Sequence, residues 1–205
     1  LKGLANDGRG EESGVGSLNF IVAEESRIQG LGDFENATVA VSALGGQAHL
    51  DVQTVLEREG VDLSTVEFIA IPPPQMDAAV RQGQVDIIAL VEPLGTAAVQ
   101  AGGVRMVGQM DDALPNAPMF VLAATEEFVN SDLEQAKRFE AALLKANALV
   151  NEDRDFANTV MESFLDMPAE LITASSIPLF ATKTLSEADL RPVAERLVKF
   201  GVIDA

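Results

Sequence analysis

The sequence contains no cysteine. This absence excludes disulfide bonds, a thiolate nucleophile and a zinc site built on cysteine. Histidine is nearly absent too, since His49 is the single one, and no set of further metal ligands accompanies it. We therefore expect neither a metal nor a cofactor.

Basic residues are scarce, with 14 Lys and Arg against 32 Asp and Glu and a formal net charge of −18. Nucleic acids and anionic membranes bind basic surfaces, so neither is expected as the main partner. An anionic ligand stays compatible, because one local site can oppose the overall field. Long apolar runs are missing as well, so no segment is predicted to span a membrane.

The chain opens without methionine and without the pattern of a signal peptide. We therefore expect that Leu1 is not the natural start. The 205 residues are 47% hydrophobic and 22% charged, which is a normal globular balance that supports a substantial core.

Strand and helix patterns alternate through the middle of the sequence, which predicts an α/β unit with a mostly parallel sheet at about 37–112. Apolar strands enter and leave this unit. Two chain crossings between lobes form a hinge, and the cleft beside a hinge is a common place for a small ligand. In chain order, the expected strands are 18–23, 38–41, 66–71, 85–91, 104–107 and 118–124, and the expected helices are 47–59, 75–82 and 93–101.

Outside this unit, we expect a loop at 1–17 and helices in most of the remaining C-terminal part. Ser131 to Glu134 form a capping box, which predicts a helix start at Ser131. Shorter helices are expected at 156–165 and 168–174. A last helix lies between 186 and 200, where Pro192 moves the expected start to Asp189. The inward faces of the two long helices are predicted to hold Leu133, Ala136, Phe139, Leu143, Ala146 and Val150, and then Leu190, Val193 and Leu197.

Three corners after predicted strands are candidate binding positions, because ligands of open α/β sheets bind beyond the carboxyl ends of strands. The first corner is "SALGG", where Ser42 and the N–H groups near Gly45, Gly46 and Gln47 suit a carboxylate, a sulfonate or a polar ring substituent. A simple turn with a local serine cap explains it equally well. The corner lacks the lysine and the glycine spacing of a nucleotide-binding loop.

The second corner, "PPPQM", offers the amide of Gln75, with Met76 either beside the ligand or in the core. The third is Glu92, whose carboxylate either accepts a hydrogen bond from the ligand or interacts favourably with the dipole of the following helix. His49 is a weaker candidate, in the first turn of its helix and off the apolar stripe. Asp86 is expected to fix the loop before its strand.

No convincing catalytic set is visible. Ser42, His49 and a carboxylate have no spacing that supports a triad. The sequence therefore favours a binding protein over an enzyme.

The stretches "TVAVSALGGQAHLDVQTVLEREGVD", "VEFIAIPPPQMDAAVRQGQVDIIALVEP" and "MFVLAATEEFV" together resemble one family. It comprises the substrate-binding proteins of bacterial ABC importers for nitrate, sulfonate, taurine and pyrimidine-type compounds, the NMT1/THI5-like group. The resemblance covers nearly the whole chain from Leu18. The order "PPPQM…GQVD…VEP" is fairly specific for the group and says little about the ligand.

The resemblance implies a type II periplasmic-binding fold, in which two α/β lobes with mostly parallel sheets are joined by two crossover strands. Residues 1–27 and 117–205 would form a partial first lobe, and residues 28–116 the second lobe. Ser42, Gln75 and Glu92 fall where members line the cleft from the second lobe. The implied partners are a small organic or anionic solute and the permease of an ABC transporter.

The resemblance further implies that about a third of the protein precedes Leu1, including a signal peptide and a lipid anchor. The protein would then be periplasmic or a cell-surface lipoprotein. With the first lobe incomplete, the 205-residue chain would bind poorly alone and expose apolar surface that favours oligomers.

Two alternatives on the same fold remain. One is a cytosolic enzyme of thiamine-pyrimidine synthesis, although that branch carries a cysteine-rich motif that this sequence lacks. The other is the effector-binding domain of a transcription regulator, for which no helix-turn-helix pattern or basic patch is present.

Overall fold

The structure is a computed structural model that describes residues 2–6, 18–110, 121–176 and 178–204. The chain forms two compact units. The helical unit comprises the described parts of Leu1–Ser13, Leu114–Thr173 and Pro178–Arg196. The sheet unit comprises those of Gly14–Ala113, Ala174–Ile177 and Leu197–Ala205.

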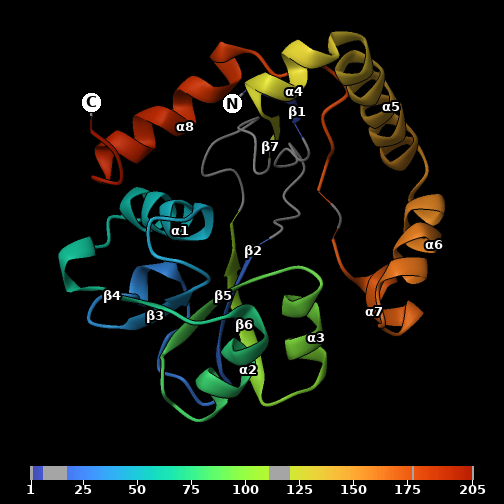
Figure 1. The fold of residues 1–205 in the computed structure, drawn as a ribbon. Helices are drawn as coiled ribbons and strands as arrows, with labels where there is room; N and C mark the ends of the chain where they lie inside the picture. Colours follow the sequence, from blue (N-terminus) through green and yellow to red (C-terminus); the bar gives the residue numbers. More distant parts are fainter. Residues whose placement is uncertain (1, 7–17, 111–120, 177, 205) are drawn as a thin grey trace. The chain divides into compact units, whose positions relative to one another are not determined.

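The sheet unit alternates strands with helices, as the sequence predicts (Figure 1). Its elements in chain order are β2 (Leu18–Ala23), η1 (Leu31–Asp33), β3 (Thr38–Val41), α1 (Gln47–Arg58), η2 (Leu63–Thr65), β4 (Glu67–Ala70), α2 (Pro73–Arg81), β5 (Ile87–Val91), α3 (Leu94–Gln100) and β6 (Val104–Gln109).

The five strands pair in the order β4-β3-β5-β2-β6. Strand β3 is parallel to β4 and β5, whereas β2 is antiparallel to both β5 and β6. Four strands therefore run in one direction and β2 runs against them, which confirms the predicted α/β class with a mostly parallel sheet. It follows that β3, β4, β5 and β6 end at the edge where β2 begins. We call this edge the carboxyl edge.

Helices cover both faces of the sheet. On one face, Val52, Val55 and Leu56 of α1 pack in a core with Phe20 and Val39 from the strands. On the other face, α2 and α3 lie side by side (Figure 1) and bury a second core against the strands. Its side chains are Ile21, Ala40, Met76, Ala79, Val80, Val85, Ile88, Leu90, Ala98 and Val104.

Local chemistry sets the ends of these helices. Helix α1 is followed by Gly60, whose φ of +78° is in the left-handed region that glycine adopts without strain. Helix α2 begins at Pro73, two residues earlier than predicted, because proline suits the first turn, where no N–H donor is needed. Arg81 at its end donates to both carboxylate oxygens of Asp77 and to two carbonyls, those of Ala98 and Gly102.

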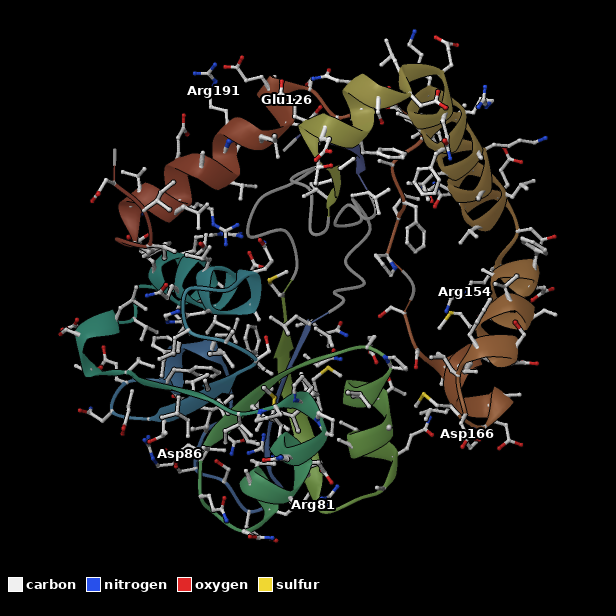
Figure 2. All side chains as sticks on the ribbon, viewed as in Figure 1. Arg81, Asp86, Glu126, Arg154, Asp166 and Arg191 are labelled. Carbon is white, nitrogen blue, oxygen red and sulfur yellow. The ribbon has the colours of Figure 1, made fainter. Side chains whose placement is uncertain are left out.

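Asp86 has the structural role that the sequence predicts for it. Its carboxylate accepts the Thr38 N–H at 2.8 Å, and its own N–H donates to the Thr38 carbonyl at 3.0 Å. The residue therefore joins the starts of β3 and β5, at the end of the sheet opposite the carboxyl edge. Figure 2 labels Asp86 and, at the end of α2, Arg81.

The helical unit combines one antiparallel strand pair with a series of helices. The strands are β1 (Lys2–Asn6) and β7 (Val121–Ala124), and the helices are α4 (Glu126–Ser131), α5 (Leu133–Glu152), α6 (Arg154–Phe164), α7 (Ala169–Ala174) and α8 (Glu187–Lys199). The last residues of α7 and α8, which are Ala174 and residues 197–199, are grouped with the sheet unit. None of the helices in the described part of the chain combines the length and apolarity needed to cross a membrane.

Three expectations for this unit are wrong. Strand β1 lies inside the predicted loop 1–17, because its backbone pairs with β7. The polar, glycine-rich stretch 1–17 gives no strand signal. The cap of α5 is Asp132, which accepts the Gln135 N–H at 2.9 Å, and Ser131 instead ends the unpredicted helix α4. Helix α8 begins at Glu187 and keeps Pro192 inside it.

The predicted inward faces are also largely open. Of the six residues on the α5 stripe only Ala136 is buried, whereas Leu133 and Phe139 are 50% and 51% exposed. Leu190 of α8 is exposed as well. Periodicity identifies the apolar face of a helix, but whether other elements pack over that face is decided by the tertiary structure. The described elements of this unit leave these faces uncovered.

The domain boundaries at 27/28 and 116/117 stay a prediction. The compact units group the chain differently, since β2 lies with the sheet unit because it pairs with β5 and β6. The predicted strand 118–124 is observed from Val121, and its first residues lie outside the described part.

Candidate functional site

The three predicted corners lie along one edge of the sheet unit. Ser42 follows β3, Gln75 lies in the first turn after β4, and Glu92 follows β5. Because β3, β4 and β5 are parallel, their ends all lie at the carboxyl edge. This is the edge at which open α/β sheets bind ligands.

The first corner exposes hydrogen-bonding groups. The Ser42 hydroxyl is exposed and has no hydrogen-bond partner among the described residues. Gly46 caps α1 in an extended conformation, and no side chain of the described residues caps this helix. The N–H groups of Gln47 and Ala48 likewise have no partner in the described ranges. Free N–H groups at the start of a helix carry partial positive charge and attract an anion or an acceptor.

Two other N–H groups of this corner are already occupied. The Gly46 N–H donates to the Ala43 carbonyl at 3.2 Å, and the Gly45 N–H donates to His49 Nδ1 at 2.9 Å. The Gln47 side chain is also held, because its amide donates to both oxygens of buried Asp51 at 2.9 Å. The donors left for a ligand therefore include the Ser42 hydroxyl and the N–H groups of Gln47 and Ala48.

His49 has a structural role in this turn. Its ring packs against Phe68 with centroids 4.5 Å apart, and partial burial lowers the pKa of His49 below its ordinary value. Accepting the Gly45 N–H requires an unprotonated Nδ1, so the neutral ring carries its proton on Nε2. Gly45 itself has a φ of +72°, and the Val202 side chain lies within 3.4 Å of the position that a Cβ there would take.

Gln75 is exposed in the first turn of α2, and its side-chain amide has no partner in the part of the chain that the structure describes. Its N–H donates to the Pro72 carbonyl at 2.8 Å. Met76 is fully buried in the core between α2 and the sheet, which leaves only Gln75 available from this corner.

Glu92 is half-buried and already receives three hydrogen bonds. Its Oε1 accepts from Asn19 Nδ2 at 2.9 Å and from Thr96 Oγ1 at 2.9 Å, and its Oε2 accepts the Thr96 N–H at 3.1 Å. The bonds from Thr96 match the alternative in which Glu92 favours the start of α3. The bond from Asn19 was not anticipated.

Asn19 connects Glu92 to a further residue that the sequence analysis missed. It is 0% exposed in β2, and its Oδ1 accepts from Gln109 Nε2 at 2.8 Å. Gly95 provides the space, because a Cβ there would lie 2.1 Å from Asn19 Nδ2. The one signal in the sequence was an asparagine inside the apolar strand "LNFIVA". We call Glu92, Asn19 and Gln109 the amide relay.

The described residues contain no group of three or more His, Asp or Glu side chains placed to hold a metal ion. The carboxyl edge offers hydrogen-bonding groups: helix N–H donors after β3, the Glu92 carboxylate after β5, and two amides, those of Asn19 in β2 and of Gln109 at the end of β6.

Known proteins resemble the chain over most of its length. The putative aliphatic sulfonates-binding protein of Escherichia coli K12 is 27% identical over 155 residues, which are 76% of this chain and 48% of that protein. The alkanesulfonate-binding protein SsuA from Xanthomonas axonopodis pv. citri, solved bound to MOPS, aligns with a TM-score of 0.78 at 17% identity. That alignment covers 97% of this chain and 68% of SsuA.

The same fold also occurs in an enzyme. The desulfurization enzyme DszB aligns with a TM-score of 0.69 at 15% identity, covering 98% of this chain and 74% of that chain. These structural likenesses show the fold, which is that of the periplasmic binding proteins, as the resemblance implied. The chain spans about half the length of the curated relative that it matches.

The sequence profile of the NMT1-like family matches residues 20–164. This range includes β3, β4 and β5 with all three candidate corners, together with the whole amide relay except Asn19. The chain belongs to the NMT1-like family.

Proposed function

We propose that this protein is the solute-binding component of an ABC-type importer and captures a small organic or anionic solute. The observation that carries the proposal is the uncapped start of α1 beside the exposed Ser42 hydroxyl, at the carboxyl edge of the sheet. Free donors at such an edge bind an anionic or acceptor-rich group. The names of the relatives, which include sulfonate-binding proteins, agree with this chemistry.

The proposed ligand contacts are the residues of the three corners. Ser42 and the backbone of Gln47 donate to the acceptor-rich end of the solute. Gly45, Gly46 and His49 shape the turn, and Gln75 and Glu92 meet the rest of the solute. Glu92 would repel a bare inorganic anion, so an organic solute with a donor group fits better than nitrate.

The further parts of the proposal concern the whole protein. Residues 28–116 are the second lobe of a two-lobed binder, and residues 1–27 and 117–205 form part of the first lobe. The protein acts outside the cytoplasm, held by a lipid anchor, and delivers its solute to a permease. It does not transform the solute, so the solute recovered after incubation should be unchanged.

Calorimetric titration with a panel of alkanesulfonates, aminoalkanesulfonates and nitrate tests the site. Ser42→Ala should weaken binding by about 1 kcal/mol, because it removes one neutral hydrogen bond. Glu92→Ala should cost about 1.5–3 kcal/mol if the carboxylate receives a charged donor. Ser64→Ala is the matched control, since Ser64 lies in η2 before β4. Unchanged affinity in both site variants would remove the corners from the proposal.

A further inference from the structure

The amide relay has only one hydrogen-bonding arrangement while Glu92 is ionised. A carboxylate has no donor, so the group of Asn19 that faces Glu92 must be its NH₂. Asn19 then presents its oxygen to Gln109, and Gln109 must present its NH₂ in return. Glu92 therefore fixes the orientation of both amides through the buried Asn19.

The relay ends at Gln109 Oε1, an oxygen that can accept a further hydrogen bond. Gln109 Oε1 has no hydrogen-bond partner among the described residues, and the Gln109 side chain is half-buried at the end of β6. Gln109 thus presents an acceptor at the carboxyl edge, and it cannot reverse its amide without placing two oxygens, its own and that of Asn19, against each other.

We propose that Gln109 is a ligand-selecting residue that accepts a hydrogen bond from a donor group of the solute, in the simplest case a protonated amine. This inference rests on the proposed solute-binding function and adds a specificity-determining residue to it. Glu92 acts on this contact as a positioning residue, by orienting the relay, and its negative charge favours a cationic group nearby.

The positions of the two kinds of groups on the sheet favour a solute with two different ends. The donors of the first corner follow β3, whereas the relay spans β5, β2 and β6. Neighbouring strands lie about 4.8 Å apart, so Ser42 and Gln109 are separated by three spacings, or about 14 Å between backbones. A solute that contacts both ends must bridge what the Ser42 and Gln109 side chains leave of this distance. An aminoalkanesulfonate has an anionic end for α1 and a donor end for Gln109.

The test uses a matched pair of probes, 3-aminopropanesulfonate and propanesulfonate, which share a sulfonate and three carbons and differ in the amine. Dissociation constants for both are measured by calorimetry. We expect the protein to bind the amine-bearing probe more tightly. Gln109→Met keeps the length of the side chain and removes the acceptor, so it should lower the preference about tenfold or more.

Two further variants separate selection from structural damage. Glu92→Gln keeps the shape and removes the charge that orients the relay, so it should also lower the preference for the amine. Gln100→Met is the matched control, because Gln100 is exposed at the far end of α3. This variant should prefer the amine-bearing probe as strongly as the unchanged protein does.

Each outcome decides between the hypotheses. Loss of the amine preference in Gln109→Met, with propanesulfonate affinity retained, supports the inference. An equal preference in Gln109→Met and the unchanged protein, or tighter binding of propanesulfonate, overturns the inference and leaves solute binding intact. If neither these sulfonates nor the rest of the panel bind, the proposed function itself fails and the inference fails with it.

Discussion

Gly95→Ala tests whether the amide relay is built as tightly as the distances indicate. Gly95 is buried in α3, and a Cβ there would lie 2.1 Å from Nδ2, 3.0 Å from Cγ and 3.2 Å from Cβ of Asn19. Asn19 cannot move away freely, because it is fully buried and bonded at both ends, to Glu92 and to Gln109.

The magnitude follows from three contributions. Overpacking of a core position costs about 1–3 kcal/mol. Displacing Asn19 breaks a hydrogen bond to a carboxylate, which is worth about 1.5–3 kcal/mol. Alanine is a better helix residue than glycine by about 1 kcal/mol, which offsets part of this loss. We expect Gly95→Ala to lower the free energy of unfolding by about 2–4 kcal/mol.

Urea denaturation followed by circular dichroism measures this change. Gly32→Ala is the control, because a Cβ at Gly32 meets nothing within 4 Å, and it should leave the stability nearly unchanged. The sign of the effect distinguishes the two explanations, because replacing glycine by alanine in a helix ordinarily raises the free energy of unfolding. A Gly95→Ala protein as stable as the unchanged one would refute the geometry of the relay.

Two other predictions concern stability alone. Because the pKa of His49 is lowered in the folded state, its contribution to stability is present above the unfolded pKa of about 6.5 and is lost as the pH falls through the lowered folded value. The unfolding free energy of the unchanged protein should therefore fall more between pH 7.5 and pH 5 than that of His49→Gln, and equal slopes would contradict the lowered pKa of the half-buried His49. Arg81→Met removes two bonds to carbonyls of the α3 segment and a pair with Asp77, so it should destabilise by about 1–2 kcal/mol. Arg138→Met, at an exposed residue of α5, should stay within about 0.5 kcal/mol of the unchanged protein, and an equal loss in both would contradict a specific role of Arg81.

Much of the sheet unit could be predicted from the sequence, because local signals and the final fold agree there. Alternating apolar runs, glycines after helices and prolines after β4 mark the elements within a few residues. The corner from Ser42 to Gly46 was predicted on the same basis, since a strand that passes through two glycines into a helix leaves N–H groups free.

The helical unit was harder to predict because its elements depend on partners far away in the chain. Strand β1 exists through its pairing with β7, more than a hundred residues later. Phe139 and Leu133 lie on a predictable apolar stripe, yet whether a stripe is covered depends on other elements. Ser131 and Asp132 are both good helix caps by residue type. Ser131 is part of the preceding helix α4, so Asp132 caps α5.

By itself, the sequence determined the α/β class, the three corners at the ends of strands and the acidic character of the chain. Only the tertiary structure decided which groups at those corners stay free. In the folded chain the Gly45 N–H donates to His49, and Met76 is buried. Hydrogen bonds across three strands join Glu92, Asn19 and Gln109. Strand order controls such contacts, because residues 73 and 90 positions apart become neighbours only when β2 inserts between β5 and β6.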